Sequence, residues 1–222
     1  MHHRRTVLKA ALAGLFLLVS TVAAPAAAEE DAKAFVNRVA NAAMETMTAK
    51  NMSDQERVAK FRTLFVANVD LPEIGRFVLG RYWRTATPEQ QHEFIKLFED
   101  IVVLTWSTRF KDYAGGMIHE VTNVTQDGER GLVVDSLVKA DKQQEPIMLQ
   151  WRLRQPDNGF KVVDLVVAGS SMAITYRSEY ASVVQSNGGK VDGLLAAMRR
   201  KVAQLEAERA SAAAAPGTTK AN

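Results

Sequence analysis

The period of the hydrophobic pattern changes once along the chain, at Gly115-Gly116, and this change limits the possible folds more than any other feature. Before the glycine pair, apolar residues recur every three or four positions, which is typical of amphipathic helices. After it, four apolar runs are separated by short polar turns, which join neighbouring antiparallel strands. The sequence therefore predicts an α+β fold, with helices before and after a twisted four-stranded antiparallel sheet and packed chiefly on one of its faces.

The four apolar runs predict strands over 117–125, 131–139, 146–154 and 160–167. In the third run Leu149 and Trp151 alternate with Gln150 and Arg152, which predicts one dry and one wet face. The fourth run is apolar on both faces, so part of it requires cover on both sides.

Helical spacing predicts helices over 34–50, 53–69, 72–79, 87–114, 170–185 and 191–205. Ser53 and Glu56 have the spacing of a capping box, and Thr87 and Gln90 have the same spacing at the start of the fourth helix. A serine of the pair Ser170-Ser171 is placed to cap the fifth helix.

Both ends of the chain differ from the middle. Residues 1–28 have a basic start, a short apolar run and a small-residue end, which predicts a signal peptide cleaved before Glu29. Arg4-Arg5 also fits a twin-arginine signal, and either that route or ordinary unfolded export leads out of the cytoplasm. Residues 29–206 are predicted to form one domain, and the Ala-rich residues 207–222 a frayed helix end passing into a disordered tail.

Charge and cysteine content narrow the possible partners. Three of the 28 Lys and Arg residues and no acid lie in the predicted signal, so the remainder balances the 25 Asp and Glu residues. A neutral mature chain gives no electrostatic reason to expect nucleic acid binding. The chain has no cysteine, so burial alone must hold the fold in an oxidising compartment.

Motifs for catalysis or metal binding are weak. His92 and His119 have no partner at a metal-site spacing, which argues against a metal site. Ser170-Ser171 follows a strand and opens a helix, but the sequence Ala-Gly-Ser-Ser-Met lacks the Gly-x-Ser-x-Gly spacing of a nucleophile elbow.

Two carboxylates inside apolar strands, Asp135 and Asp164, leave an enzyme open as an alternative. A buried acid has a raised pKa suited to proton transfer, as in an isomerase or hydratase acting on a hydrophobic molecule. The other interpretation is structural: the two carboxylates face solvent or pair with Arg152 or Arg154 across the sheet. The structural interpretation is favoured, so the chain is expected not to be an enzyme.

Four segments resemble one known family. They are 163–172 (Val-Asp-Leu-Val-Val-Ala-Gly-Ser-Ser-Met), 176–180 (Tyr-Arg-Ser-Glu-Tyr), 188–194 (Gly-Gly-Lys-Val-Asp-Gly-Leu) and 76–83 (Arg-Phe-Val-Leu-Gly-Arg-Tyr-Trp). In their order they resemble the MlaC family of periplasmic phospholipid-binding carriers. That family is also called the toluene-tolerance or auxiliary ABC-transport component family, and it includes a hopanoid-associated branch. The resemblance covers roughly residues 34–202.

The resemblance implies a cone similar to nuclear-transport-factor-2 domains, with an internal apolar pocket between sheet and helices. It implies a monomeric carrier without cofactor that moves phospholipid between the outer and inner membranes of a Gram-negative envelope. The implied partners are an inner-membrane ABC transporter with MCE-type subunits and an outer-membrane lipoprotein–porin complex. A hopanoid or other terpenoid lipid is the alternative cargo.

The pocket is predicted from aromatic and aliphatic residues that converge from several helices and the sheet with few polar partners among them. The predicted lipid-binding residues are Phe77, Tyr82, Phe98, Ile101, Val102, Trp106, Leu149, Trp151, Val163, Leu165 and Tyr176.

Overall fold

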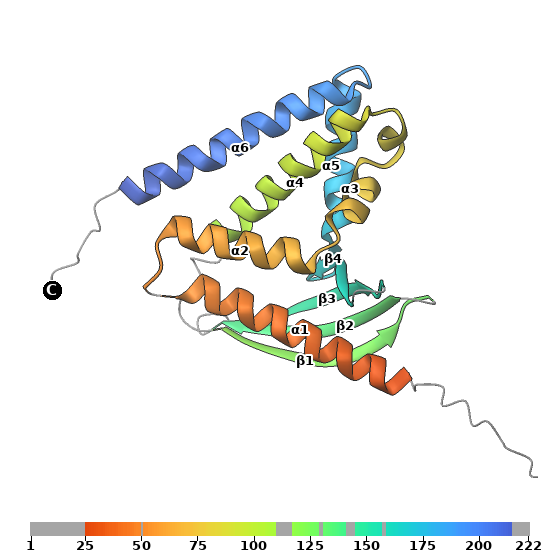
Figure 1. Ribbon diagram of the computed structural model, residues 1–222, viewed down its shortest axis with the longest axis vertical. Helices are drawn as coiled ribbons and strands as arrows, with labels where there is room; N and C mark the ends of the chain where they lie inside the picture. Colours follow the sequence, from red (N-terminus) through yellow and green to blue (C-terminus); the bar gives the residue numbers. More distant parts are fainter. Residues whose placement is uncertain are drawn as a thin grey trace, which may run out of the picture.

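The computed structural model describes residues 25–49, 51–109, 117–128, 131–140, 145–156 and 159–214 (Figure 1). Its helices are α1 (Pro25–Thr48), α2 (Asp54–Asn68), α3 (Leu71–Leu79), the 3-10 helix η1 (Gly80–Arg84), α4 (Pro88–Arg109), α5 (Met172–Ser186) and α6 (Val191–Ala214). Its strands are β1 (Met117–Gln126), β2 (Gly131–Ala140), β3 (Ile147–Arg154), β4 (Lys161–Val167) and β5 (Ser170–Ser171). The predicted α+β class and the change from helices to strands are confirmed.

The strands form one antiparallel sheet in the order β1-β2-β3-β4-β5. The sequence predicted four strands, and the fifth is the two-residue β5, which had been assigned to the helix start. Ala168 and Gly169 connect it to β4 with φ angles of 47° and 81°. Positive φ at both central residues is the geometry of the tightest hairpin turn, so the chain reverses there and β5 pairs with the end of β4.

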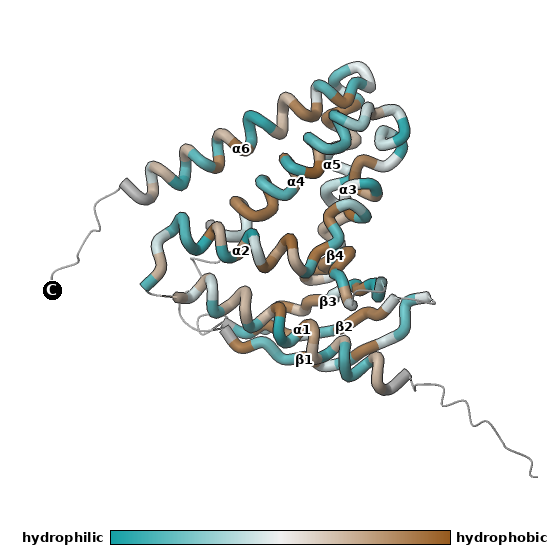
Figure 2. Tube along the Cα trace, in the orientation of Figure 1, coloured by the Kyte–Doolittle hydropathy of each residue, from teal (hydrophilic) through white to brown (hydrophobic). Residues whose placement is uncertain are grey.

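Helix α1 lies across one face of the sheet (Figure 1). Its apolar side buries the following cluster against β2, β3 and β4: Ala32, Phe35, Val36 and Val39 with Leu132, Val134, Leu153 and Val162. On β3 the predicted alternation is only partly present: Leu153 is fully buried whereas Met148 and Arg152 are exposed, but Leu149, Gln150 and Trp151 are all half-buried. In Figure 2 hydrophilic positions are frequent along β1 and α6.

Helices α3 to α6 bury a second cluster of their own, separate from the cluster under α1. It centres on Phe94, Val184, Leu194 and Leu195, each at most 1% exposed. A third, small cluster of Met47, Phe61 and Val103 joins α1, α2 and α4. The sheet layer and the helical layer therefore have distinct interiors, and Val69, which follows α2, packs against both.

The predicted helix starts are confirmed at α2, α4 and α5. Ser53 and Glu56 form a complete capping box. The backbone N–H of Thr87 donates to Gln90 Oε1 at 3.0 Å, and the N–H of Gln90 donates to Thr87 Oγ1 at 3.3 Å. Ser171 Oγ accepts from the backbone N–H of Ile174, three residues into the fifth helix.

The side chain of Arg57 caps the C-terminal end of α1. Arg57 of α2 donates from Nη1 to the carbonyls of Thr46 (3.0 Å) and Met47 (2.6 Å), and from Nη2 to those of Ala49 (3.0 Å) and Met52 (3.1 Å). The last carbonyls of a helix have no partner within it, so this guanidinium satisfies groups that α1 cannot satisfy itself.

At the termini, most of the predicted signal, residues 1–24, lies outside the described residues, and 25–28 form the first turn of α1. The C-terminal helix differs from the prediction, because α6 continues through the Ala-rich stretch to Ala214. Alanine is the strongest helix former, so the composition that suggested a tail also extends the helix. Within the described residues, no helix combines the length and apolar character needed to cross a membrane.

Candidate functional site

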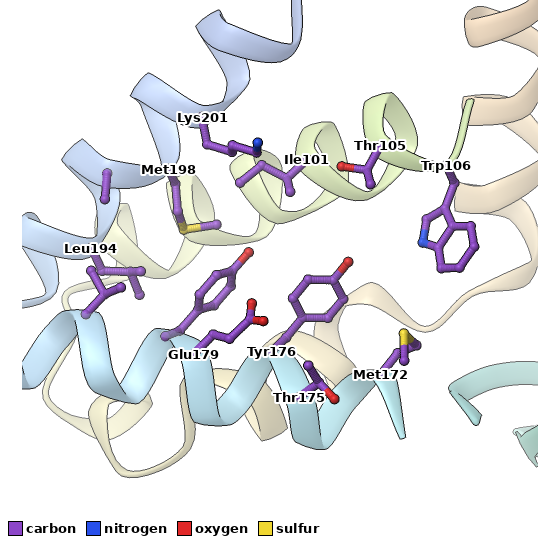
Figure 3. A pocket seen from close by; sticks show the side chains of 13 residues that line it. Ile101, Thr105, Trp106, Met172, Thr175, Tyr176, Glu179, Leu194, Met198 and Lys201 are labelled. Atoms are coloured by element: carbon purple, nitrogen blue, oxygen red, sulfur yellow. The ribbon is translucent and has the colours of Figure 1, made fainter. Parts of the chain in front are cut away.

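Helices α4, α5 and α6 enclose a groove of about 500 Å³ (Figure 3). Its lining comes from α4 and from the consecutive helices α5 and α6, which lie more distant in sequence. The lining residues are Ile101, Thr105 and Trp106 of α4; Met172, Thr175, Tyr176, Glu179, Tyr180 and Val183 of α5; and Leu194, Ala197, Met198 and Lys201 of α6.

Helical spacing places these side chains on facing sides of the three helices. Met172, Tyr176 and Tyr180 follow one another at four-residue intervals on α5, as do Leu194 and Met198 on α6. Residues four apart share one face of a helix, so each helix presents a continuous stripe to the groove. The wall is mainly apolar.

Aromatic rings form one side of the groove. The ring of Tyr180 meets Phe94 edge to face at 5.8 Å and Phe98 at 6.3 Å between ring centroids. Tyr176 meets Phe98 edge to face at 5.2 Å. Such contacts fix the rings in place, because each is favourable only in a narrow range of orientations.

The hydroxyl of Tyr180 is a polar group among these aromatic rings. The residue is 8% exposed, and its hydroxyl has no hydrogen-bond partner among the described residues. Burial raises the pKa of the Tyr180 hydroxyl, and the nearby Tyr176 and Glu179 act in the same direction. The hydroxyl therefore keeps its proton at neutral pH and is a hydrogen-bond donor.

The charged residues of the groove are exposed, in contrast to its buried floor. Glu179 of α5 and Lys201 of α6 are both exposed, while Leu194 and Met198 are 1% and 2% exposed. Figure 3 shows Lys201 and Glu179 on different helices, with Ile101 and Tyr176 also on the lining. An amphipathic molecule with a polar end and a hydrocarbon end fits this polarity gradient.

The structure brings three of the predicted lipid-binding residues together in the groove: Ile101, Trp106 and Tyr176. Two others, Phe98 and Val102, are 3% and 6% exposed and belong to the core of the helical layer. Phe98 still supports the groove through its contact with Tyr176.

The remaining predicted residues lie elsewhere. Phe77 is 42% exposed, with the Arg177 guanidinium 4.8 Å above its ring, and Tyr82 packs partly buried against the helical core. Leu149, Trp151, Val163 and Leu165 are half-buried residues of β3 and β4. Trp151 Nε1–H donates to Ser136 Oγ at 3.0 Å within the sheet. The groove thus lies among three helices, whereas the family resemblance suggested a pocket between the sheet and the helices.

Sequence reasoning missed the contribution of α6. Helical spacing predicted the helix over 191–205, but an apolar stripe does not distinguish a groove wall from a core. Ala197 and Lys201 could have indicated the groove, since a small residue and a charged residue beside an apolar stripe leave part of that stripe uncovered by protein.

The two carboxylates considered for catalysis have structural partners. Asp164 Oδ2 accepts from Ser171 Oγ–H at 2.6 Å, its Oδ1 accepts from the backbone N–H of Ala173 at 3.0 Å, and Arg152 Nε lies 3.9 Å away. Asp164 therefore anchors the first turn of α5. The predicted pairing with Arg152 is confirmed.

Asp135 is held in a similar way within the sheet. Its Oδ1 accepts from Gln150 Nε2 at 2.9 Å and its Oδ2 from Asn123 Nδ2 at 3.3 Å. Neither side chain lines the groove of α4, α5 and α6.

We expect Asp164→Asn to lower the free energy of unfolding by about 1–2 kcal/mol. The amide has one acceptor where the carboxylate has two, and it loses the favourable interaction of a negative charge with the N-terminus of α5. Urea unfolding followed by circular dichroism measures the change, with Asp135→Asn as a control away from any helix end. Equal stability of Asp164→Asn and wild type would mean that this contact does not hold α5.

A metal centre has no support in the described part of the chain, where no group of three or more His, Asp or Glu side chains converges. His119 lies on β1 with its ring edge-to-face to Trp151 at 6.2 Å. Both of its ring nitrogens are buried without a hydrogen-bond partner among the described residues, and burial lowers the pKa of His119.

Comparisons with known proteins show the family of this chain. A family model described as MlaC protein matches residues 37–200. A curated relative, the intermembrane phospholipid transport system binding protein MlaC of Haemophilus influenzae, is 24% identical over 140 residues. That match covers 61% of this chain and 64% of the relative.

A solved structure shares the fold. It is the phospholipid-binding protein from Ralstonia solanacearum in complex with a phospholipid, with a TM-score of 0.71 and 25% identity. The match covers 79% of this chain and 99% of that one. Since the family model spans most of the domain and its strands and helices recur in a phospholipid-bound structure, the chain belongs to the MlaC family.

Proposed function

We propose that the protein is a periplasmic carrier that binds a phospholipid and moves it between the outer and inner membranes. The observation that carries this proposal is the groove of α4, α5 and α6, with its buried apolar floor and its exposed charged residues. The relative in Haemophilus influenzae is named as a phospholipid transport binding protein, and the Ralstonia solanacearum structure holds a phospholipid. Both support the same ligand class.

The physical task of such a carrier is desolvation. A two-chain lipid with about 30 methylenes faces roughly 20 kcal/mol or more if its tails cross bare water, at ~0.8 kcal/mol per methylene. A groove of about 500 Å³ lies in the size range of ligand pockets, roughly 300–1,000 Å³, and supplies a dry surface for hydrocarbon. The headgroup remains at the exposed rim and needs few specific contacts.

Transfer of the lipid then requires no covalent chemistry, only docking that joins one apolar pocket to another. The predicted secretory signal supports export from the cytoplasm, and the intermembrane transport system named for the Haemophilus influenzae relative supports the periplasm as its destination. The partners we propose are an inner-membrane ABC transporter with MCE-type subunits and an outer-membrane lipoprotein–porin complex. The system named for the Haemophilus influenzae relative supports a transport assembly of this kind.

Mass spectrometry of organic extracts tests the cargo directly. The protein is purified from the periplasm without detergent and extracted with chloroform and methanol. We expect two-chain phospholipid at about one molecule per groove, since a single groove of this size cannot hold several. A polycyclic lipid in place of phospholipid would identify a terpenoid carrier, and an extract without any lipid would contradict the proposal.

A further inference from the structure

The hydroxyl of Tyr180 is a buried donor without an acceptor. The residue is 8% exposed. Its hydroxyl oxygen is buried and has no hydrogen-bond partner among the described residues. A buried hydroxyl that bonds with neither protein nor water destabilises the fold, whereas a phenylalanine of the same shape would not. This donor nevertheless belongs to a residue of the groove wall.

The neighbouring rings hold this hydroxyl in place. Phe94 and Phe98 meet the Tyr180 ring nearly perpendicularly, at interplanar angles of 87° and 86°, and Tyr176 packs beside it at 5.9 Å. With the ring enclosed on these sides, the hydroxyl cannot turn far to find water. Because the oxygen is closed to solvent while its residue lines the groove, an acceptor reaches it only when neighbouring groove side chains move apart.

The groove contains the three kinds of group that an acyl lipid also contains. The charged side chains of Glu179 and Lys201 are exposed. The hydroxyl of Tyr180 is buried, and Leu194 and Met198 form a buried apolar floor. In an acyl lipid a charged headgroup is followed by carbonyl oxygens and then by methylenes. The carbonyl is the acceptor that occurs between the charge and the hydrocarbon.

We propose that Tyr180 is a ligand-binding residue whose hydroxyl donates a hydrogen bond to an acyl carbonyl oxygen of the lipid in the groove. The inference rests on the proposed function and adds a chemical preference to it. The carbonyl belongs to a fatty ester of a phospholipid or to the carboxyl group of a free fatty acid. A polycyclic hydrocarbon without a carbonyl cannot make this bond, so Tyr180 favours acyl lipids over terpenoids.

Binding measurements with matched lipids test this assignment. Delipidated mature protein is titrated with a diester phosphatidylethanolamine, with the diether phosphatidylethanolamine of the same chain length, and with palmitic acid. Trp106, on the groove wall, serves as the fluorescent reporter. We expect Tyr180→Phe to weaken binding of the diester about tenfold and to leave binding of the diether unchanged. A loss seen only with palmitic acid would support the same bond and identify the fatty acid as its source.

Tyr82→Phe is the control, since it removes a tyrosine hydroxyl that lies outside the groove. The assignment is overturned if Tyr180→Phe binds the diester as tightly as wild type, or if both variants lose diester and diether equally. Wild-type protein that binds neither phospholipid would instead contradict the proposed function. Thermal unfolding of the delipidated proteins separates binding from folding, and Tyr180→Phe is expected to be at least as stable as wild type. If Tyr180→Phe fails to fold, the test is made on wild-type protein alone. Wild-type protein that binds the diester and the diether with equal affinity then overturns the assignment.

Discussion

Replacing Ala197 with tryptophan is expected to reduce the affinity for phospholipid about a hundredfold. Ala197 is a half-buried groove residue of α6, and an indole there would occupy space that hydrocarbon would otherwise fill. Excluding roughly four methylenes from the dry groove costs the complex ~3 kcal/mol, which corresponds to the expected loss. Lipid content per purified protein, measured by phosphate analysis, and titration of the delipidated protein both report it.

The control for this variant is Ala203→Trp, on an exposed face of the same helix. Both substitutions replace alanine by a residue of weaker helix propensity, so they lower helix stability by a similar small amount. Only Ala197→Trp fills the groove. If both variants retain the lipid content of wild type, the groove of α4, α5 and α6 is not where the tails lie.

Removal of the Arg57 side chain is expected to produce the largest loss of stability. Arg57→Ala deletes a guanidinium that bonds four backbone carbonyls at the end of α1 and in the following turn. Because hydrogen bonds to charged groups are strong and some of these carbonyls would regain water, we expect a loss of about 3 kcal/mol in the free energy of unfolding. For a domain of this size that lowers the Tm by roughly 6–12 °C, measurable by differential scanning calorimetry.

Arg57→Lys separates charge from geometry. Lysine keeps the positive charge but has no planar fork, so it cannot reach four carbonyls at once. We expect it to recover less than half of the lost stability. An Arg57→Ala protein that unfolds at the wild-type temperature would show that α1 is held only by its apolar contacts with the sheet.

Most of the fold could be predicted because local signals agreed with one another. The period change at Gly115-Gly116 separated helices from strands, and polar turns gave the antiparallel order. Capping residues such as Ser53 and Thr87 gave the helix starts. These signals act over a few residues, so a single sequence contains them completely.

The groove could be predicted only in part, because it depends on how three helices are placed relative to one another. Ile101, Trp106 and Tyr176 line the groove, whereas Val102 does not, although Ile101 and Val102 belong to the same buried cluster. In one sequence a core residue and a groove residue have the same apolar character. The difference arises from the spacing between helices, which side chains such as Ala197 set by being small.

The separate interiors of the two layers have a consequence for cargo exchange. Opening the space between α4, α5 and α6 disturbs side chains of the helical cluster, while the contacts that join α1 to the strands remain intact. In the proposed carrier, release of a tail therefore rearranges helical packing, while the packing of α1 on the sheet is kept.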